Sequence, residues 1–264
     1  MSVSVVRSDD AAQNWRRRVA RAFSRAAPRY LELASAQARL GETLWPLLPQ
    51  AARTVLDLGC GPGHWSARLA AHYPAARVWG LDLAPGMLAE ARRRHGDHAS
   101  WLCADATALP LASGSMDLVF SNLALQWCPR PEQALREIRR VLRPGGLALI
   151  NTLGPGTLAE VARAWSEAGR TGGVLAFDGA ERHLAGARRA GFRHVELQAQ
   201  RRRFHYADFG AVRASIKGVG AQVARPGARL GRADLVRAEE RYEALREPAG
   251  LPVSYHLFTL QLKV

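Results

Sequence analysis

The chain has 264 residues, of which 48% are hydrophobic, and a formal net charge of +14. No apolar run approaches the roughly 20 residues of a membrane helix, and residues 1–10 carry no signal-peptide pattern, so we expect a cytoplasmic protein without a membrane partner. The positive charge comes almost entirely from arginine, since only Lys217 and Lys263 are lysines.

An amphipathic helical region is expected from Trp15 to Leu48, with an interruption at Pro28. Strands are then expected at 53–59, 77–82, 99–103, 116–121 and 146–152, and helices at 64–72, 86–95 and 131–142. Pro144-Gly145-Gly146 is expected to end the last of these helices and to start its strand. The alternation predicts a parallel sheet with helices on both faces.

The C-terminal part is expected to hold helices near 158–167 and 179–190, with Asp178 capping the second, and a strand around 195–204. Residues 207–250 have a helical pattern broken by glycine and proline, before a final strand from Ser254 to Leu262, so we predict a lid insertion there. The predicted fold is α/β, a doubly wound, mostly parallel seven-stranded sheet. Its expected parts are an N-terminal helical cap (1–50), a core (51–206), the lid insertion (207–250) and the final strand of the core (251–264).

A glycine-rich turn follows the first expected strand, with Gly59, Gly61 and Gly63 directly after an apolar run. Glycine lets the backbone close a tight turn and approach a ligand without interference from a Cβ atom. Asp82 ends the second strand about 20 residues further on, where a carboxylate can accept both hydroxyl groups of an adenosine ribose. This pattern indicates a nucleotide-type binding site.

Two residues at this turn favour S-adenosylmethionine over a dinucleotide. A carboxylate at Asp57 would repel the pyrophosphate of a nicotinamide or flavin cofactor, but it suits a ligand that carries an ammonium and a sulfonium. His64 stands where the dinucleotide fingerprint requires its third glycine.

The segments 55–63 and 116–123, together with Asp82 and Asp105, resemble the class I S-adenosylmethionine-dependent methyltransferases. The segments 23–30, 121–128, 215–221 and 252–258 are similar to the biotin-pathway malonyl-acyl-carrier-protein O-methyltransferases, the BioC family. The last two segments lie outside the cofactor core, so they say more about the subfamily than the glycine turn does.

This resemblance implies methyl transfer to the free carboxylate of a malonyl thioester on acyl-carrier protein, early in biotin (pimeloyl) synthesis. The expected partner is an acidic carrier protein, and the enzyme is expected to be a monomer that binds no nucleic acid. A malonyl carboxylate is ionised at neutral pH, because carboxylic acids titrate at about 4, so no general base is needed. A cation should hold one carboxylate oxygen and leave the other free to attack.

The resemblance also implies which residues bind the cofactor. We expect Asp57, Gly59 and Gly61 at the methionine end, Asp82 and Leu83 near the ribose, Asp105 and Ala106 at the adenine, Asn122 after the fourth strand, Phe23 and Tyr30 as a cover, and Met87 as a further cofactor contact. Simpler roles stay open for some of them. Asp82 could only cap a helix, Asp105 could cap a turn, and Phe23 and Tyr30 could form a plain core stripe.

The roles of the candidate substrate-binding residues have more alternatives. Arg201, Arg202, Arg203 and Lys217 are candidates for the carboxylate clamp, and Gln126, Trp127, Tyr255 and His256 for the pocket that surrounds it. Only alternate arginines of the run can face the same way in a strand, and the run could equally be a solvated edge. His256 could be an ordinary core histidine.

The arginine excess has two explanations at this point. It is either a compositional bias that solvates helix faces or a surface for an acidic partner. No nucleic-acid-binding motif is present, so an acidic protein is the better functional explanation. The three cysteines, Cys60, Cys103 and Cys128, lack metal-ligand spacing, and we expect reduced thiols and no metal.

Two other functions stay open. The first is a methyltransferase, or a hydroxylase of the same fold, that acts on another small acid, a quinone or a protein arginine. The second is a non-catalytic protein that binds S-adenosylmethionine or nucleic acid. The intact Asp57, glycine turn and Asp82 argue against a loss of cofactor binding.

Overall fold

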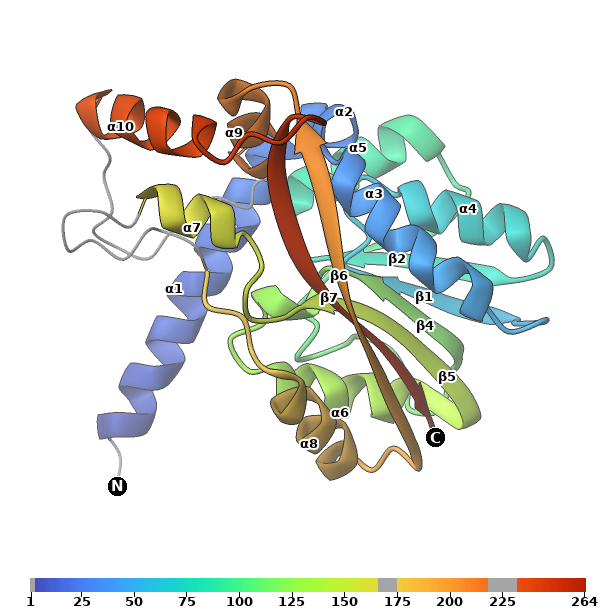
Figure 1. Ribbon diagram of the computed structural model, residues 1–264. Coiled ribbons are helices and arrows are strands. Elements are labelled where there is room, and N and C mark those ends of the chain that lie inside the picture. The colour runs from blue at the N-terminus through green and yellow to red at the C-terminus, as the bar shows by residue number, and fades with distance from the viewer. Residues whose placement is uncertain (1–2, 166–174, 218–231) are drawn as a thin grey trace.

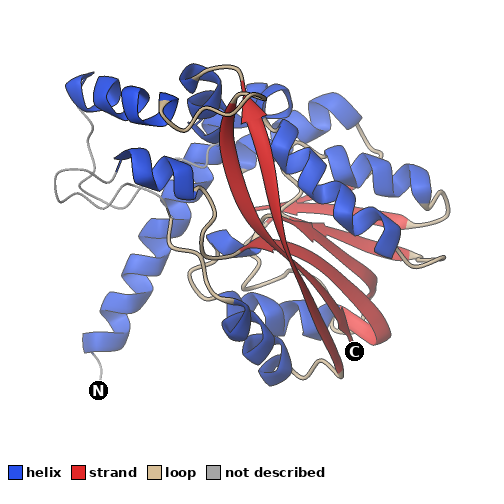
Figure 2. Cartoon of the chain, in the orientation of Figure 1, coloured by secondary structure: helices blue, strands red, loops and turns tan. Residues whose placement is uncertain are grey.

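The structure is a computed structural model that describes residues 3–165, 175–217 and 232–264. At its centre lies a seven-stranded sheet in the order β3-β2-β1-β4-β5-β7-β6. Helices cover both faces of this sheet (Figure 1, Figure 2). The predicted doubly wound, mostly parallel sheet is confirmed. In the described parts of the chain, no helix is both long and apolar enough to span a membrane.

Five parallel strands make up one part of the sheet: β1 (Thr54–Leu58), β2 (Arg77–Asp82), β3 (Ser100–Cys103), β4 (Met116–Asn122) and β5 (Leu142–Leu153). The helices that connect them are α4 (His64–His72), α5 (Pro85–His95) and α6 (Pro131–Val141). Leu56, Leu118 and Leu149 are completely buried. Such uninterrupted burial is typical of parallel strands that have helices on both sides.

β5 begins earlier than predicted. Leu142 already pairs with Met116 directly after α6, and the register shifts before the regular pairing of Leu118 with Leu147. Gly145 takes a positive φ of 76° inside this irregular start. The Pro-Gly-Gly sequence therefore bends a strand that has already joined the sheet, rather than separating the helix from it.

Two long antiparallel strands complete the sheet, β6 (His194–Tyr206) and β7 (Leu251–Lys263). They extend toward α9 (Phe209–Lys217) and α10 (Arg232–Glu243), past the ends of the parallel strands (Figure 1). α7 (Ala159–Trp165) packs on α10 and β7, and α8 (Ala180–Ala190) packs on α6. Asp178 does not cap α8, because Gly179 occupies the N-cap position and Asp178 accepts a hydrogen bond from Arg182 instead.

The N-terminal region is helical and starts before the predicted Trp15. It consists of α1 (Val3–Ala26), η1 (Ala27–Arg29), α2 (Tyr30–Leu33), α3 (Ser35–Gly41) and η2 (Glu42–Leu47). Pro28 lies in η1, as expected for a residue that interrupts a helix. α1 packs against α5, next to the carboxyl ends of the parallel strands.

Candidate functional site

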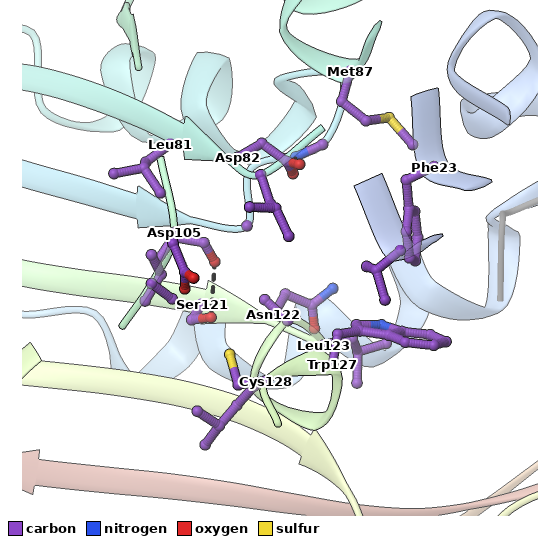
Figure 3. A pocket seen from close by; sticks show the side chains of 18 of the residues that line it. Phe23, Leu81, Asp82, Met87, Asp105, Ser121, Asn122, Leu123, Trp127 and Cys128 are labelled. Atoms are coloured by element: carbon purple, nitrogen blue, oxygen red, sulfur yellow. Dashed lines mark hydrogen bonds between the residues drawn. The ribbon is translucent and has the colours of Figure 1, made fainter. Parts of the chain in front are cut away.

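A cleft opens at the carboxyl ends of β1, β2, β3 and β4, the edge at which open α/β sheets bind ligands. Its space, including the open mouth, is about 870 Å³. Figure 3 shows Asp82, Asp105, Phe23 and Trp127 around one open space. Every residue predicted to bind the cofactor lines this cleft except Asp57: Phe23, Tyr30, Gly59, Gly61, Asp82, Leu83, Met87, Asp105, Ala106 and Asn122.

The glycine turn after β1 forms one wall. Gly59, Gly61 and Gly63 have φ angles of 75°, 54° and 83°. A Cβ atom at Gly59 would lie 2.2 Å from the Cβ of Ala124, so the turn and the loop after β4 approach each other more closely than a side chain permits. The backbone N–H groups of Gly59 and Cys60 both donate to the carbonyl of Leu81. The turn is thus held against the end of β2.

Asp82 joins two of the loops that form the cleft. One carboxylate oxygen accepts the N–H of Gly61 at 2.9 Å and the other accepts the N–H of Ala84 at 2.8 Å. Burial raises the pKa of Asp82, and the backbone hydrogen bonds oppose this rise. Each oxygen keeps a lone pair for a further donor such as a ribose hydroxyl. Asp82 is not the cap of α5, whose N-cap residue is Ala84 with no side-chain cap, and it holds the glycine turn instead.

Asp57 lies behind the turn. Its side chain is 1% exposed, and it accepts a hydrogen bond of 2.6 Å from the hydroxyl of Ser66. Burial raises the pKa of Asp57 to about 7, while the Ser66 hydrogen bond acts in the opposite direction. Because Asp57 does not line the cleft, its predicted role at the methionine end stays a prediction, and it would act through charge rather than contact.

Asp105 pairs with an arginine that sequence reasoning missed. One oxygen of Asp105 accepts the N–H of Thr107 at 2.8 Å, and the other lies 2.7 Å from Nε of Arg16. Arg16 also donates to the hydroxyl of Thr107 at 3.3 Å and lines the cleft. The available signal was its spacing, because Arg16, Val19 and Phe23 share one face of α1.

Aromatic residues from two segments cover the cleft. Phe23 of α1 and Trp127 of η3 (Leu125–Trp127) meet edge to face, with ring centroids 5.2 Å apart. The indole N–H of Trp15 donates to the carbonyl of Trp127 at 2.9 Å. Burial, followed by the charge of Asp82, raises the pKa of Tyr30, so its hydroxyl stays protonated. Phe23 and Tyr30 lie in the cleft wall, which favours ligand contact over a plain core stripe.

The loop after β4 is held by a network of amides. Asn122 donates to the carbonyl of Gln37 at 3.0 Å and accepts from the side chain of Asn151 at 3.2 Å. Leu123 has a φ of 60°, which is rare for a residue with a branched side chain. Gln126, predicted to shape the substrate pocket, does not line the cleft and donates to the carbonyl of Leu123 at 2.8 Å.

The predicted substrate residues on β7 face opposite sides of the sheet. Tyr255 is 3% exposed and packs on Phe204, with ring centroids 5.6 Å apart. His256 points the other way, where a Cβ atom on Gly156 would lie 3.0 Å from its Nε2. Neither residue lines the cleft, and burial is the main cause that raises the pKa of Tyr255.

The predicted arginines lie on the exposed edge strand. Arg201 and Arg203 share the face of Ser254, and donate to its hydroxyl at 3.3 Å and 3.4 Å. Arg203 also pairs with Glu247 at 2.5 Å. Neither residue lines the cleft, and the side chain of Lys217 lies outside the described part of the structure. The catalytic roles of these residues stay predictions.

A cation for the acceptor is not evident in the described wall. Among the described residues that line the cleft, Arg16 is the one cation, and its charge is paired with Asp105. Leu123 connects the cleft to helix α9, because it also packs against the buried cluster that contains Phe209 and Val212. Lys217 is the last residue of this helix.

Comparisons with known proteins agree with this geometry. Residues 56–150 match the family model described as a methyltransferase domain. The chain is 39% identical to the malonyl-acyl-carrier-protein O-methyltransferase of Herminiimonas arsenicoxydans, over 89% of this chain and 91% of that protein. It is also 39% identical to the biotin biosynthesis bifunctional protein BioHC of Cellvibrio japonicus, over 94% of this chain, which spans 50% of that longer protein.

Solved structures agree with the fold. A putative methyltransferase from Bacillus halodurans superposes with a TM-score of 0.59 at 18% identity, over 86% of this chain and 98% of that chain. An S-adenosylmethionine-dependent methyltransferase from Thermotoga maritima, a possible histamine N-methyltransferase, gives 0.57 at 18% identity, over 93% of this chain and 99% of that chain.

Proposed function

The chain belongs to the malonyl-acyl-carrier-protein O-methyltransferases, and from that membership we propose that it methylates the free carboxylate of a malonyl thioester on acyl-carrier protein, early in biotin synthesis. It is an enzyme that depends on S-adenosylmethionine. The observation that carries the proposal is the cleft, in which the Asp82 carboxylate joins the glycine turn to the loop after β2. Relatives named for this activity match most of the chain's length.

The chain's own residues fit the cofactor. Because Gly59 and Gly61 have no side chains, the glycine turn leaves room for the methionine part of the cofactor. The Asp82 carboxylate can accept hydrogen bonds from the ribose hydroxyls. Asp105 and Ala106 would take the adenine end, with Phe23 and Tyr30 above it. S-adenosylmethionine, when bound, supplies a methyl group on a sulfonium that a carboxylate oxygen can attack directly.

The catalytic task of the chain is then to position the acceptor and exclude water. No general base is required, because the malonyl carboxylate is already ionised at neutral pH. Phe23 and Trp127 close the cleft with apolar surface, which strips water from the attacking oxygen. The strained Leu123 and the amide network behind it fix the loop against which the acceptor would align.

A mass-shift assay with S-adenosylmethionine tests the proposal. Malonyl-carrier protein, malonyl-CoA and free malonate are each incubated with the enzyme, and we expect a gain of one methyl group on the carrier-bound malonyl group. Cleavage of the thioester should release the extra methyl group together with the malonyl group and return the carrier to its unloaded mass, which places the methyl on the acyl group and not on the protein. Methylation of free malonate alone, or of none of the three, would contradict the proposed substrate and reopen the other acceptors.

We also propose that the chain divides into parts with separate roles. Residues 1–50 would form a cap over the cofactor, 51–206 and 251–264 the core, and 207–250, which lie partly outside the described residues, a lid insertion between β6 and β7. The enzyme would act as a cytoplasmic monomer without nucleic acid or membrane partners. Light scattering tests the monomer, and S-adenosylhomocysteine should slow proteolysis of 207–250 if these residues cover the cleft.

A further inference from the structure

Helix α1 has two chemically different faces. Its inner face supplies Arg16, Val19 and Phe23 to the wall of the cleft. Its outer face carries Arg17, Arg21 and Arg25, whose side chains are exposed. Residues four apart are neighbours on a helix surface, so these three arginines form one stripe. We call Arg17, Arg21 and Arg25 the α1 stripe.

The α1 stripe has no negative partner. Among the described residues no carboxylate pairs with any of its three guanidinium groups, and no acidic residue occurs between positions 11 and 31. Some arginines elsewhere in the described chain do have such partners. Examples are Arg68 with Glu42, Arg140 with Glu137, Arg182 with Glu132 and Arg246 with Glu243.

Other exposed arginines, among them Arg188, Arg189 and Arg193, have no carboxylate at ion-pair distance among the described residues either. What separates the stripe from general arginine enrichment is its place on the helix whose inner face lines the cleft. Three unpaired like charges on one helix face repel one another and slightly destabilise the helix. Such a surface is more readily explained by an external anionic partner than by a contribution to stability.

The position of the stripe selects the kind of partner. A helix with its side chains is about 10–12 Å across, so the outer face of α1 lies one helix diameter from the cleft wall that the inner face forms. The side chains of Arg17, Arg21 and Arg25 are exposed, which leaves this face open to a partner. A protein seated there could direct a flexible thioester arm around the helix and into the cleft.

We propose that the α1 stripe is the docking surface for an acidic carrier protein that presents the malonyl thioester. This inference rests on the proposed function. Unpaired exposed charges act over long range, so the stripe would raise the rate at which the carrier meets the enzyme and orient it beside the cleft. A small thioester without a protein would not need the stripe.

The test compares two triple variants with the same change in net charge. Arg17, Arg21 and Arg25 are replaced by Gln in the first, and Arg188, Arg189 and Arg193 in the second. The second set is also exposed, but it lies at the end of α8 and just beyond it, and none of its members lines the cleft. Initial rates are measured with malonyl-carrier protein and with malonyl-pantetheine, which has no protein.

We expect the α1 triple variant to raise KM for malonyl-carrier protein about tenfold, at roughly twofold for each exposed charge, with kcat and malonyl-pantetheine kinetics unchanged. The α8 triple variant should behave like wild type. A third variant with Lys at positions 17, 21 and 25 should recover most of the loss, because it keeps the charges.

Several results would overturn the docking surface. An unchanged KM in the α1 variant, an equal rise in the α8 variant, or a failure of the Lys variant to recover would each do so, the last because a damaged helix rather than lost charge would then explain the effect. If wild type methylates neither thioester, the proposed function fails instead. Binding of unloaded carrier to the same variants, measured by calorimetry, then still decides the surface.

Discussion

The cofactor edge and the β6–β7 pair use their polar side chains in different ways. At the cofactor edge, Asp82 is fixed by backbone N–H groups and still faces an open cleft. On the β6–β7 pair, Arg203 is occupied by Glu247 and Ser254. A polar group that is held in place but keeps free lone pairs can bind a ligand, whereas groups that satisfy one another mainly hold the fold together.

The two regions also differ in how sequence maps onto space. Residues that follow parallel strands gather at one edge of a sheet, so Gly59, Asp82, Asp105 and Asn122 meet although they are far apart in the chain. Neighbouring residues within a strand point to opposite faces, so Tyr255 and His256 are separated. Proximity in the sequence therefore predicts a shared site poorly on the β6–β7 pair.

The largest effect should come from Lys217, at the end of α9. We expect Lys217→Met to lower turnover on malonyl-carrier protein about hundredfold or more, because a desolvated carboxylate without a cation loses charge-assisted bonding. The affinity for S-adenosylhomocysteine should stay near that of wild type. Turnover and calorimetry on the same preparations measure both quantities.

The controls for this prediction lie in the same chain. Lys263→Met removes the other lysine, which is exposed at the end of β7, and should leave turnover unchanged. Arg201→Gln and Arg203→Gln should reduce turnover only a few fold, because both side chains lie outside the cleft wall. Normal turnover of Lys217→Met would exclude it as the clamp, and a large loss in either arginine variant would restore that arginine as the candidate.

The second effect concerns the cofactor edge alone. Asp82→Ala removes the acceptor for the N–H groups of Gly61 and Ala84 and for the ribose. Lost charge-assisted hydrogen bonds of about 1.5–3 kcal/mol should weaken S-adenosylhomocysteine binding tenfold to hundredfold. Calorimetry measures the change, and the exposed Asp97→Ala is the control. An unchanged affinity in a folded variant would remove Asp82 from the site.

The third effect tests the residue that α1 adds to this edge. Arg16→Gln leaves Asp105 without its ion pair and should weaken S-adenosylhomocysteine binding about fivefold to tenfold, while Arg16→Lys should recover part of the loss. Arg17→Gln, one residue further on but on the outer face, should bind like wild type. If both glutamine variants lose affinity equally, the effect belongs to the stability of α1 and not to the pair.

These outcomes bear on what the sequence alone could predict. The glycine turn, Asp82 and Asp105 were predictable because strand ends and turn residues are marked locally. Arg16 was not, since its spacing with Val19 and Phe23 marks one face of α1 but does not indicate that this face packs on the loop after β3. The early start of β5 was also missed, because the pairing of Leu142 with Met116 is a tertiary contact that overrides the local glycine signal.

The fourth effect is a pH dependence at Asp57. Burial raises its pKa to about 7, so in the free protein the stability linked to its protonated form is lost as pH rises through that value. The ammonium of the cofactor favours the ionised form, so binding should release a proton. The affinity for the cofactor should therefore rise by up to about tenfold from pH 6 to pH 8, and Asp57→Asn should reduce this dependence of affinity on pH. Calorimetry at both pH values decides, and equal slopes in both proteins would exclude Asp57 as the source.

The smallest effect belongs to the other region, where α8 covers β7. His183 is 2% exposed, lies 6.2 Å from the ring of Phe258, and has no hydrogen-bond partner for either ring nitrogen among the described residues. Burial lowers its pKa, so the folded protein prefers the neutral ring. The stability that depends on this neutral form is complete above the unfolded pKa of about 6.5 and is lost as pH falls below it.

His183→Leu should remove this dependence. From pH 7.5 to pH 5.5, wild type should lose about 2–4 °C of Tm more than the variant, which corresponds to about 1 kcal/mol for a chain of this size. The variant should also be no less stable at pH 7.5, since leucine takes away two unpaired polar atoms. His194→Leu, an exposed histidine on β6, should follow wild type at both pH values. If His183→Leu and wild type lose the same Tm, the acid sensitivity of the fold comes from other groups and the buried ring is a passive part of the core.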